Sequence, residues 1–243
     1  MLKVIDTAVP VACWSCSVAH NESTLFCPHC SKIQPPTGGD YFSVFGLEPR
    51  LNLDLPALEL EFHRLSRKLH PDRFARAGEN EKQWSLADTA LLNDAYRTLK
   101  DPLRRTEYLL KLHGAEIGAP ATAGSNAAAI DDQVKSSGRG KTTRVPADLL
   151  EEVFDLNMRL EEMRRSRKMG EDDTTLKETL LEEKRKFEAL VDAVDRDLLC
   201  AWNDWDAGDA VARQSAQQAM VALLDRRRFL SNMVRDVTEI LGT

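Results

Sequence analysis

Four cysteines in two Cys-x-x-Cys pairs constrain the start of this chain more than any other feature. Cys13 pairs with Cys16 and Cys27 with Cys30, and ten residues separate the two pairs. Two residues between thiolates let a tight turn present both sulfurs to one tetrahedral ion, and a second pair completes four ligands. A closed four-thiolate site leaves no position for water, so the pattern predicts structural zinc. A redox dithiol pair and an iron–sulfur cluster are the alternatives.

The other features of this segment fit a small metal-dependent module. A segment this short cannot bury a sufficient core, so bound metal would supply its folding free energy. His20 and His29 are interpreted as surface histidines, since four thiolates make them unnecessary as ligands. The fifth cysteine, Cys200, is predicted to be a buried, inert thiol. Residues 1–12 lack the charged-then-apolar pattern of a signal peptide, so we expect a reducing compartment.

Composition excludes some classes of function. The chain has 243 residues and a net charge of −6, which argues against non-specific nucleic-acid binding by the whole chain. No apolar run approaches the roughly 18 residues that span a bilayer, so we expect no membrane contact. Shifts in composition predict a metal module over 1–37, a helical domain over 38–114, a flexible Ala/Gly/Ser-rich linker over 115–146 and a helical domain over 147–243.

The first helical domain is predicted to be a helical hairpin. Asp54 is a good N-cap, and Pro56 suits the first turn that follows it. Two apolar stripes at helical spacing come next, the first formed by Leu58, Phe62, Leu65 and Leu69, the second by Leu92, Tyr96 and Leu99. The sequence His70-Pro71-Asp72 ends the first stripe, because proline disfavours a helical residue before it. A third helix is expected over 103–112, with Gly114 as its C-cap.

The segment before and around His70-Pro71-Asp72 is basic. Between Ala57 and Arg76 there are five cations and three anions, a net charge of +2 in a chain of −6. Arg64 and Lys68 are four residues apart and therefore share one helix face. No nucleophilic serine motif or phosphate-binding glycine loop accompanies this segment, which disfavours a hydrolytic role. We interpret it as a docking surface for an acidic protein partner.

The last domain is predicted to be a bundle of three antiparallel helices. Apolar residues recur at steps of three and four in three segments, with Gly170 and Gly208 where turns are needed. These residues are Leu149, Val153, Leu156, Leu160 and Met163 in the first segment, Leu176, Leu180, Phe187, Leu190, Val194 and Leu198 in the second, and Leu230, Val234, Val237 and Leu241 in the third. The fold class is therefore all-α behind the cysteine module.

Several motifs together resemble one known family. Helix, His70-Pro71-Asp72, helix resembles the J-domains that stimulate ATP hydrolysis by DnaK-class chaperones. The wider match comprises Asp40-Tyr41-Phe42, Phe45-Gly46-Leu47, His70-Pro71-Asp72-Arg73-Phe74, Asn93-Asp94-Ala95-Tyr96-Arg97-Thr98-Leu99, Asp101-Pro102-Leu103 and Tyr108-Leu109-Leu110-Lys111-Leu112. These motifs resemble the HscB family, the J-type co-chaperones of iron–sulfur cluster assembly. The cysteine pairs and the following Gln-Pro-Pro resemble the extension of its eukaryotic, mitochondrial members.

The resemblance implies a two-ended adaptor that is not an enzyme. One end would contact a DnaK/HscA-class, mortalin-like ATPase chaperone through His70, Pro71 and Asp72, with Arg64 and Lys68 supplying charge. The other would hold an IscU-type iron–sulfur scaffold protein. The family's scaffold contacts map onto Leu150, Glu151, Phe154, Asp155, Met158, Glu162 and Phe229. Here Glu151 replaces an apolar residue and Met158 replaces a glutamate.

The resemblance also bears on location and assembly. It favours the mitochondrial matrix, with the bacterial cytoplasm as the alternative, and family members self-associate weakly. Two other classes of function stay open. One is a zinc-ribbon nucleic-acid adaptor, although Cys13 to Cys30 contain no Lys or Arg. The other is a thiol oxidoreductase that uses the Cys-x-x-Cys pairs.

Overall fold

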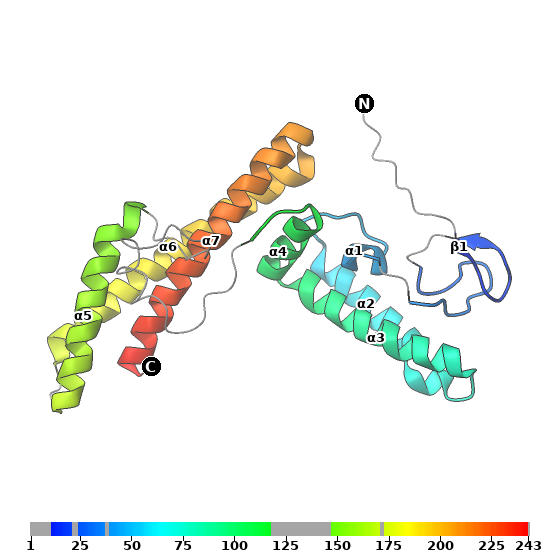
Figure 1. The fold of residues 1–243 in the computed structure, drawn as a ribbon, viewed down its shortest axis with the longest axis horizontal. Coiled ribbons are helices and arrows are strands. Elements are labelled where there is room, and N and C mark those ends of the chain that lie inside the picture. Colours follow the sequence, from blue (N-terminus) through cyan, green and yellow to red (C-terminus); the bar gives the residue numbers. More distant parts are fainter. Residues whose placement is uncertain (1–10, 21–23, 37–38, 118–146, 171–172, 243) are drawn as a thin grey trace, which may run out of the picture. The chain divides into compact units, whose positions relative to one another are not determined.

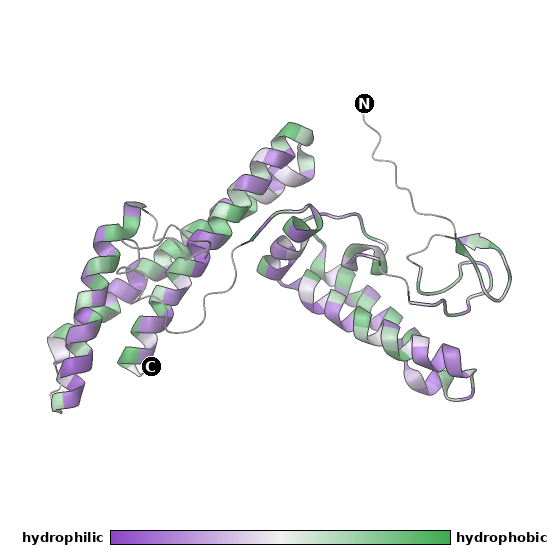
Figure 2. Cartoon of the chain, in the orientation of Figure 1, coloured by the Kyte–Doolittle hydropathy of each residue, from purple (hydrophilic) through white to green (hydrophobic). Residues whose placement is uncertain are grey.

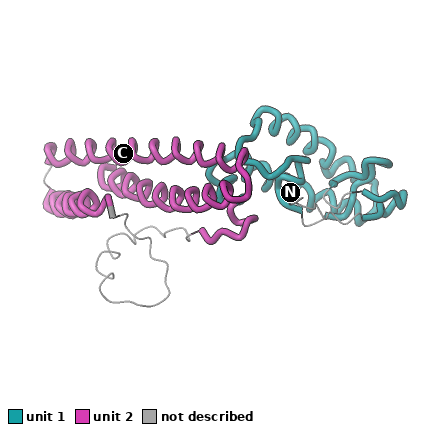
Figure 3. Tube along the Cα trace, turned by 90° about the horizontal axis from the view of Figure 1, so that it is seen from above, with its two compact units in different colours: residues 1–109 teal, residues 110–243 magenta. Residues whose placement is uncertain are grey.

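The protein, represented here by a computed structural model, consists mainly of helices (Figure 1). The structure describes residues 11–20, 24–36, 39–117, 147–170 and 173–242. It divides into two compact units, Met1–Leu109 and Leu110–Thr243 (Figure 3), and each is described by itself. The all-α prediction is confirmed. Of the linker predicted over 115–146, residues 118–146 lie outside the described residues.

The metal module is built from two short hairpins. Strands β1 (Val11–Ala12) and β2 (Ala19–His20) pair antiparallel around the first cysteine pair. An isolated bridge between Phe26 and Ile33 closes the second pair in the same way. Gln34, which follows the second hairpin, is buried and belongs to the metal module.

The helical part of unit 1 is a hairpin of α2 (Leu55–Leu69) and α3 (Glu79–Lys100), which lie side by side in Figure 1. As predicted, the Asp54 carboxylate accepts the Ala57 N–H, and Leu58, Leu65 and Leu69 are buried. Phe62 is half-buried, and its ring stacks on Tyr96 with 4.1 Å between centroids. The hairpin therefore forms where the apolar stripes predict it.

Two shorter helices precede and follow this hairpin in the sequence. Helix α1 (Tyr41–Val44) buries Phe42 against it, and the Tyr41 N–H donates to the Tyr108 hydroxyl over 2.8 Å. Helix α4 (Pro102–Leu112) begins one residue before its expected start and is followed by Gly114 at φ +73°. That left-handed conformation costs a glycine little, which explains why the helix ends there.

One buried group in this hairpin is anomalous. Asp88 on α3 is 1% exposed, and neither carboxylate oxygen has a hydrogen-bond partner among the described residues. Burial favours the neutral acid over the anion. It raises the pKa of Asp88 to about 7.

Unit 2 contains the predicted three-helix bundle, formed by α5 (Leu150–Met169), α6 (Thr174–Ala207) and α7 (Ala210–Leu241). A one-turn 3-10 helix, η3 (Ala147–Leu149), precedes α5. Gly170 ends α5 at φ +74°, as expected for a C-cap. Helices α6 and α7 continue beyond the end of α5 as a two-helix arm, where the buried residues are Leu198, Ala201, Trp202, Trp205, Ala216, Met220 and Leu224.

Apolar and polar residues are interleaved along every helix (Figure 2). Over the described residues, no helix is both long enough and apolar enough to traverse a bilayer. Each helix instead has one buried stripe. In the bundle these stripes form one core, which includes Leu156 and Leu160 of α5, Leu180 and Phe187 of α6, and Leu230 and Val237 of α7. The remaining faces of the helices are left for solvent or partners.

Candidate functional site

The four clustered cysteines come together as the sequence predicts. Their sulfur atoms all lie within 4.8 Å of one another. Sγ of Cys13 is 3.6 Å from that of Cys30, and Sγ of Cys16 is 3.8 Å from that of Cys27. Four sulfurs at zinc–thiolate distance from one tetrahedral ion would be about 3.8 Å apart. The donor set and its spacing therefore fit one tetrahedral metal ion.

The two hairpins share one backbone pattern. The N–H of Cys13 donates to the carbonyl of Val18, and the N–H of Ser17 donates to the carbonyl of Cys13. In the second hairpin, the same two bonds join Cys27 to Lys32 and Ser31 to Cys27. Ser17 and Ser31 both have left-handed φ values, 61° and 58°. Each turn thus aims two sulfurs at a common centre and accepts local backbone strain to do so.

The protonation of the sulfurs depends on their mutual contacts. Burial opposes ionisation of Cys13, but the backbone N–H groups of Cys16 and Ser15 lower its pKa to about 6. At Cys16 the backbone N–H of Val18 favours the thiolate, yet burial and the neighbouring sulfurs raise its pKa to about 12. One thiolate therefore forms easily and disfavours the next. A bound cation removes that conflict, because it stabilises every thiolate at once.

A polar group outside the ligand set supports the cluster. His20 is 8% exposed, so its interpretation as a surface residue was wrong. Its Nε2 lies 3.0 Å from Oε1 of Gln34, and the Gln34 amide nitrogen lies 3.4 Å from Sγ of Cys13. His20 thereby holds the amide that faces a ligand sulfur. His29 is exposed, as predicted.

The His70-Pro71-Asp72 loop lies between α2 and α3, as predicted. Pro71 opens the 3-10 turn η1 (Pro71–Phe74), so the helix cannot continue through it. The side chains of His70 and Asp72 are 59% and 91% exposed. Nδ1 of His70 accepts the Asp72 N–H over 3.3 Å, which fixes how the imidazole is presented.

The base of this loop is held by α3. The Leu69 carbonyl, left free by the end of α2, accepts the Ser85 hydroxyl at 2.6 Å and the Thr89 hydroxyl at 3.4 Å. Ser85 is fully buried. Two hydroxyls on the facing helix thus replace the lost helical hydrogen bond and fix the position from which His70 projects.

The predicted basic residues Arg64 and Lys68 are exposed on α2, the helix that leads into the loop. Arg64 donates to Glu61 through two nitrogens, and this pairing lowers the pKa of Glu61. Lys68 instead lies over the ring of Phe26, with Nζ 5.9 Å from the centroid. Sequence reasoning missed this contact, because no spacing rule links a metal hairpin to a helix so distant in the chain.

The residues predicted to bind a scaffold are exposed on α5, with one exception. Leu150, Phe154 and Met158 are 50%, 54% and 58% exposed. The same outward side carries the exposed residues Glu151, Asp155 and Glu162. Large apolar side chains gathered on one free helix face are typical of an interaction surface. Phe229 is 3% exposed and packs in the bundle core, and its contact with a partner stays a prediction.

The lone cysteine of the bundle was predicted wrongly. Cys200 is exposed on α6 rather than buried. Its neighbour Leu199 is 49% exposed, whereas Leu198 and Ala201 are buried. The apolar neighbours in sequence therefore do not share one face, because consecutive residues diverge on a helix.

Comparisons with known proteins point to one family. No protein-family model matches the chain. It is 31% identical over 169 residues to a mouse protein named iron-sulfur cluster co-chaperone protein HscB, covering 68% of this chain and 64% of that one. The human protein of that name is 40% identical over 109 residues, 43% of this chain and 46% of its own length. A Vibrio cholerae co-chaperone protein HscB homolog is 48% identical over 80 residues, 33% of this chain and 47% of its own.

These alignments span between about half and two thirds of the relatives' length. Solved structures extend the likeness in fold. The crystal structure of human co-chaperone protein HscB has a TM-score of 0.62 at 24% identity, covering 94% of this chain and 98% of that one. The structure of chaperone HscB from Vibrio cholerae has a TM-score of 0.51 at 25% identity, covering 83% of this chain and 97% of that one. The motifs, the fold and these relatives agree, and together they make the chain similar to proteins of the HscB family.

Proposed function

We propose that this chain is a J-domain co-chaperone that brings an iron–sulfur scaffold protein to an ATPase chaperone. Unit 1 would stimulate ATP hydrolysis by a chaperone of the DnaK/HscA class. Unit 2 would bind a scaffold of the IscU type. Two weak sites in one chain raise the effective concentration of scaffold at the chaperone. In this proposal the chain itself makes and breaks no covalent bond.

The exposed His70-Pro71-Asp72 loop is the observation that carries the proposal. Its two polar side chains face solvent, and α3 holds its base through Ser85. A rigid polar loop presents the same contacts to every partner molecule and loses little conformational entropy on binding. Arg64 and Lys68 lie on the helix that leads into it and supply complementary charge for an acidic partner.

The outward side of α5 supports the second half of the proposal. Its exposed apolar residues, Leu150, Phe154 and Met158, are flanked by the acidic residues Asp155 and Glu162. Such a face suits a partner that offers an apolar patch with a basic rim. Glu151 and Met158, which depart from the family pattern, lie on this side, so the balance of apolar and charged contacts would differ from that of other members.

For the metal centre we propose structural zinc bound by Cys13, Cys16, Cys27 and Cys30. The tetrahedral sulfur spacing supports this assignment. Zinc would hold the two hairpins together, and with four protein ligands it would have no open position for catalysis. We place the protein in the mitochondrial matrix or a bacterial cytoplasm, on the likeness to family members alone.

Single-turnover ATP hydrolysis by the cognate chaperone tests the co-chaperone function. Wild-type protein should accelerate hydrolysis, whereas His70→Gln and Asp72→Asn should not. Asp94→Asn is the matched control, because this exposed carboxylate on α3 lies away from the loop. Equal stimulation by wild type and His70→Gln would refute the proposal.

A further inference from the structure

The metal module is packed against the face of unit 1 that we propose binds the chaperone. The Trp14 ring meets the Trp84 ring edge-on, with 5.7 Å between centroids. Nζ of Lys32 lies 3.2 Å from a Glu81 carboxylate oxygen, and the same carboxylate accepts the Gly78 N–H at the start of α3. These contacts fix the cysteine hairpins on the α2–α3 hairpin, beside the predicted docking residues.

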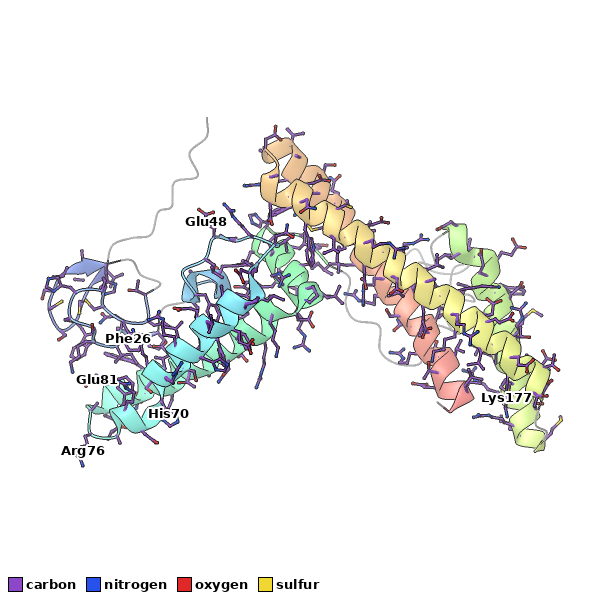
Figure 4. The ribbon with its side chains drawn as sticks, turned by 180° about the vertical axis from the view of Figure 1, so that it is seen from behind. Phe26, Glu48, His70, Arg76, Glu81 and Lys177 are labelled. Atoms are coloured by element: carbon purple, nitrogen blue, oxygen red, sulfur yellow. The ribbon has the colours of Figure 1, made fainter. Side chains whose placement is uncertain are left out.

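An open groove of about 780 Å³ lies between the two parts. One wall comes from the second cysteine hairpin, including Phe26 and Lys32, and the other from α2 and η1, including Leu65, Lys68 and Phe74. Figure 4 labels Phe26 and Glu81 at this junction and His70 on the loop nearby. The walls therefore combine aromatic and aliphatic side chains with cations.

The charge of the groove is positive. Its lining holds four cations, Lys32, Arg64, Lys68 and Arg73, against Glu61 and Glu81. Both carboxylates are paired, Glu61 with Arg64 and Glu81 with Lys32. Within the described residues, neither Lys68 nor Arg73 has a carboxylate oxygen in ion-pair distance. Lys68, which lies over the Phe26 ring, and Arg73 are thus the lining cations outside the ion pairs of the described residues.

We propose that this groove receives an acidic, extended segment of the ATPase chaperone, so that the metal module is part of the chaperone-docking surface. The inference rests on the proposed function and adds Phe26 and Lys32 to the residues that would contact the chaperone. Lys68 links the docking helix to the metal module, because its Nζ lies 5.9 Å from the Phe26 ring centroid. A partner whose carboxylates pair with Lys68 must therefore also meet the metal module. Acidic groups complement the free cations, and apolar groups between them complement Phe26 and Phe74.

The variant Phe26→Ala tests this surface without removing a metal ligand. We expect the co-chaperone concentration that gives half-maximal stimulation of chaperone ATPase to rise roughly tenfold, the usual scale for losing an aromatic interface contact. The maximal rate should stay at the wild-type value, because the His70-Pro71-Asp72 loop is intact. Leu199→Ala is the control, since it truncates an apolar side chain that is 49% exposed on α6 of the other unit. Measuring metal per chain in Phe26→Ala verifies that the cysteine hairpins still fold.

His70→Gln separates failure of this inference from failure of the proposed function. If His70→Gln stimulates as wild type does, the proposed function fails. If His70→Gln loses stimulation while Phe26→Ala has the same half-maximal concentration as Leu199→Ala, only the groove assignment is overturned. A photoreactive phenylalanine analogue at position 26 gives an independent readout. It should cross-link to the chaperone, and cross-links only to a second copy of this chain would overturn the assignment.

Discussion

The buried carboxyl group of Asp88 should make the stability of unit 1 fall as pH rises through neutrality. Its pKa is raised from 3.8 to about 7 by burial. Between these values the folded chain keeps a proton that the unfolded chain has lost, so each added pH unit removes about 1.4 kcal/mol from the free energy of unfolding. From pH 5.5 to pH 8 the loss is about 2 kcal/mol, since the effect ends once both states are ionised.

Asp88→Asn removes the ionisation and keeps the shape. The variant should lack the pH-dependent loss, so that relative to wild type it gains about 2 kcal/mol between pH 5.5 and pH 8. Any further change that the buried amide makes to the free energy of unfolding is independent of pH. That amount cancels when the values at pH 5.5 and pH 8 are subtracted. Amide hydrogen exchange of the buried part of α3, corrected for intrinsic exchange rates, measures the difference in the full chain.

Asp94→Asn serves as the control on the same helix. Its carboxylate is 60% exposed, so this variant should follow the pH dependence of the wild type. The reasoning about Asp88 is refuted if wild type and Asp88→Asn lose the same free energy between pH 5.5 and pH 8. That result would mean that solvent or an ordered water keeps the carboxylate ionised in the folded state.

Three further outcomes follow from other parts of the molecule. Ser85→Ala leaves the Leu69 carbonyl without its 2.6 Å partner; we expect about 1 kcal/mol less stability in urea unfolding and a lower maximal rate of stimulated ATP hydrolysis. Cys27→Ser removes one thiolate, so metal per chain should drop and hydrogen-exchange protection should vanish from the metal module but persist in α5–α7. Phe154→Ala truncates a side chain that is 54% exposed; the Kd for the scaffold, measured by titration calorimetry, should rise roughly tenfold while the melting temperature stays constant.

Local patterns in the sequence predicted much of this structure. The stripes ending at Leu69 and Leu99 became buried faces of two helices, because helical period and burial are linked wherever one face is covered. The break at Pro71 and the cap at Gly114 are also predicted, since they depend on backbone chemistry alone. The cysteine cluster followed from ligand spacing in the same way.

Features that depend on how distant segments pack were not predicted. Nothing near Asp88 in the sequence signals that its carboxylate lies without a partner. His20 is buried although the sequence predicts a surface residue. Its contact with Gln34 joins two hairpins, and no local pattern reveals such a contact. The apolar neighbours of Cys200 predict a buried thiol, but its own position on α6 is exposed. The groove beside Phe26 arises only when the metal module packs on α2.

If α5 binds the scaffold as proposed, the short length of its apolar stripe affects how long the scaffold stays bound. From Leu150 to Met158 the helix rises only about 12 Å, roughly two turns. A contact of that length buries far less than the roughly 800 Å² per partner of a stable complex. Because weaker contacts act mainly by faster dissociation, a scaffold held by this stripe would have a short residence time. A carrier that passes its cargo to a second protein benefits from fast release, and a longer stripe would slow that release.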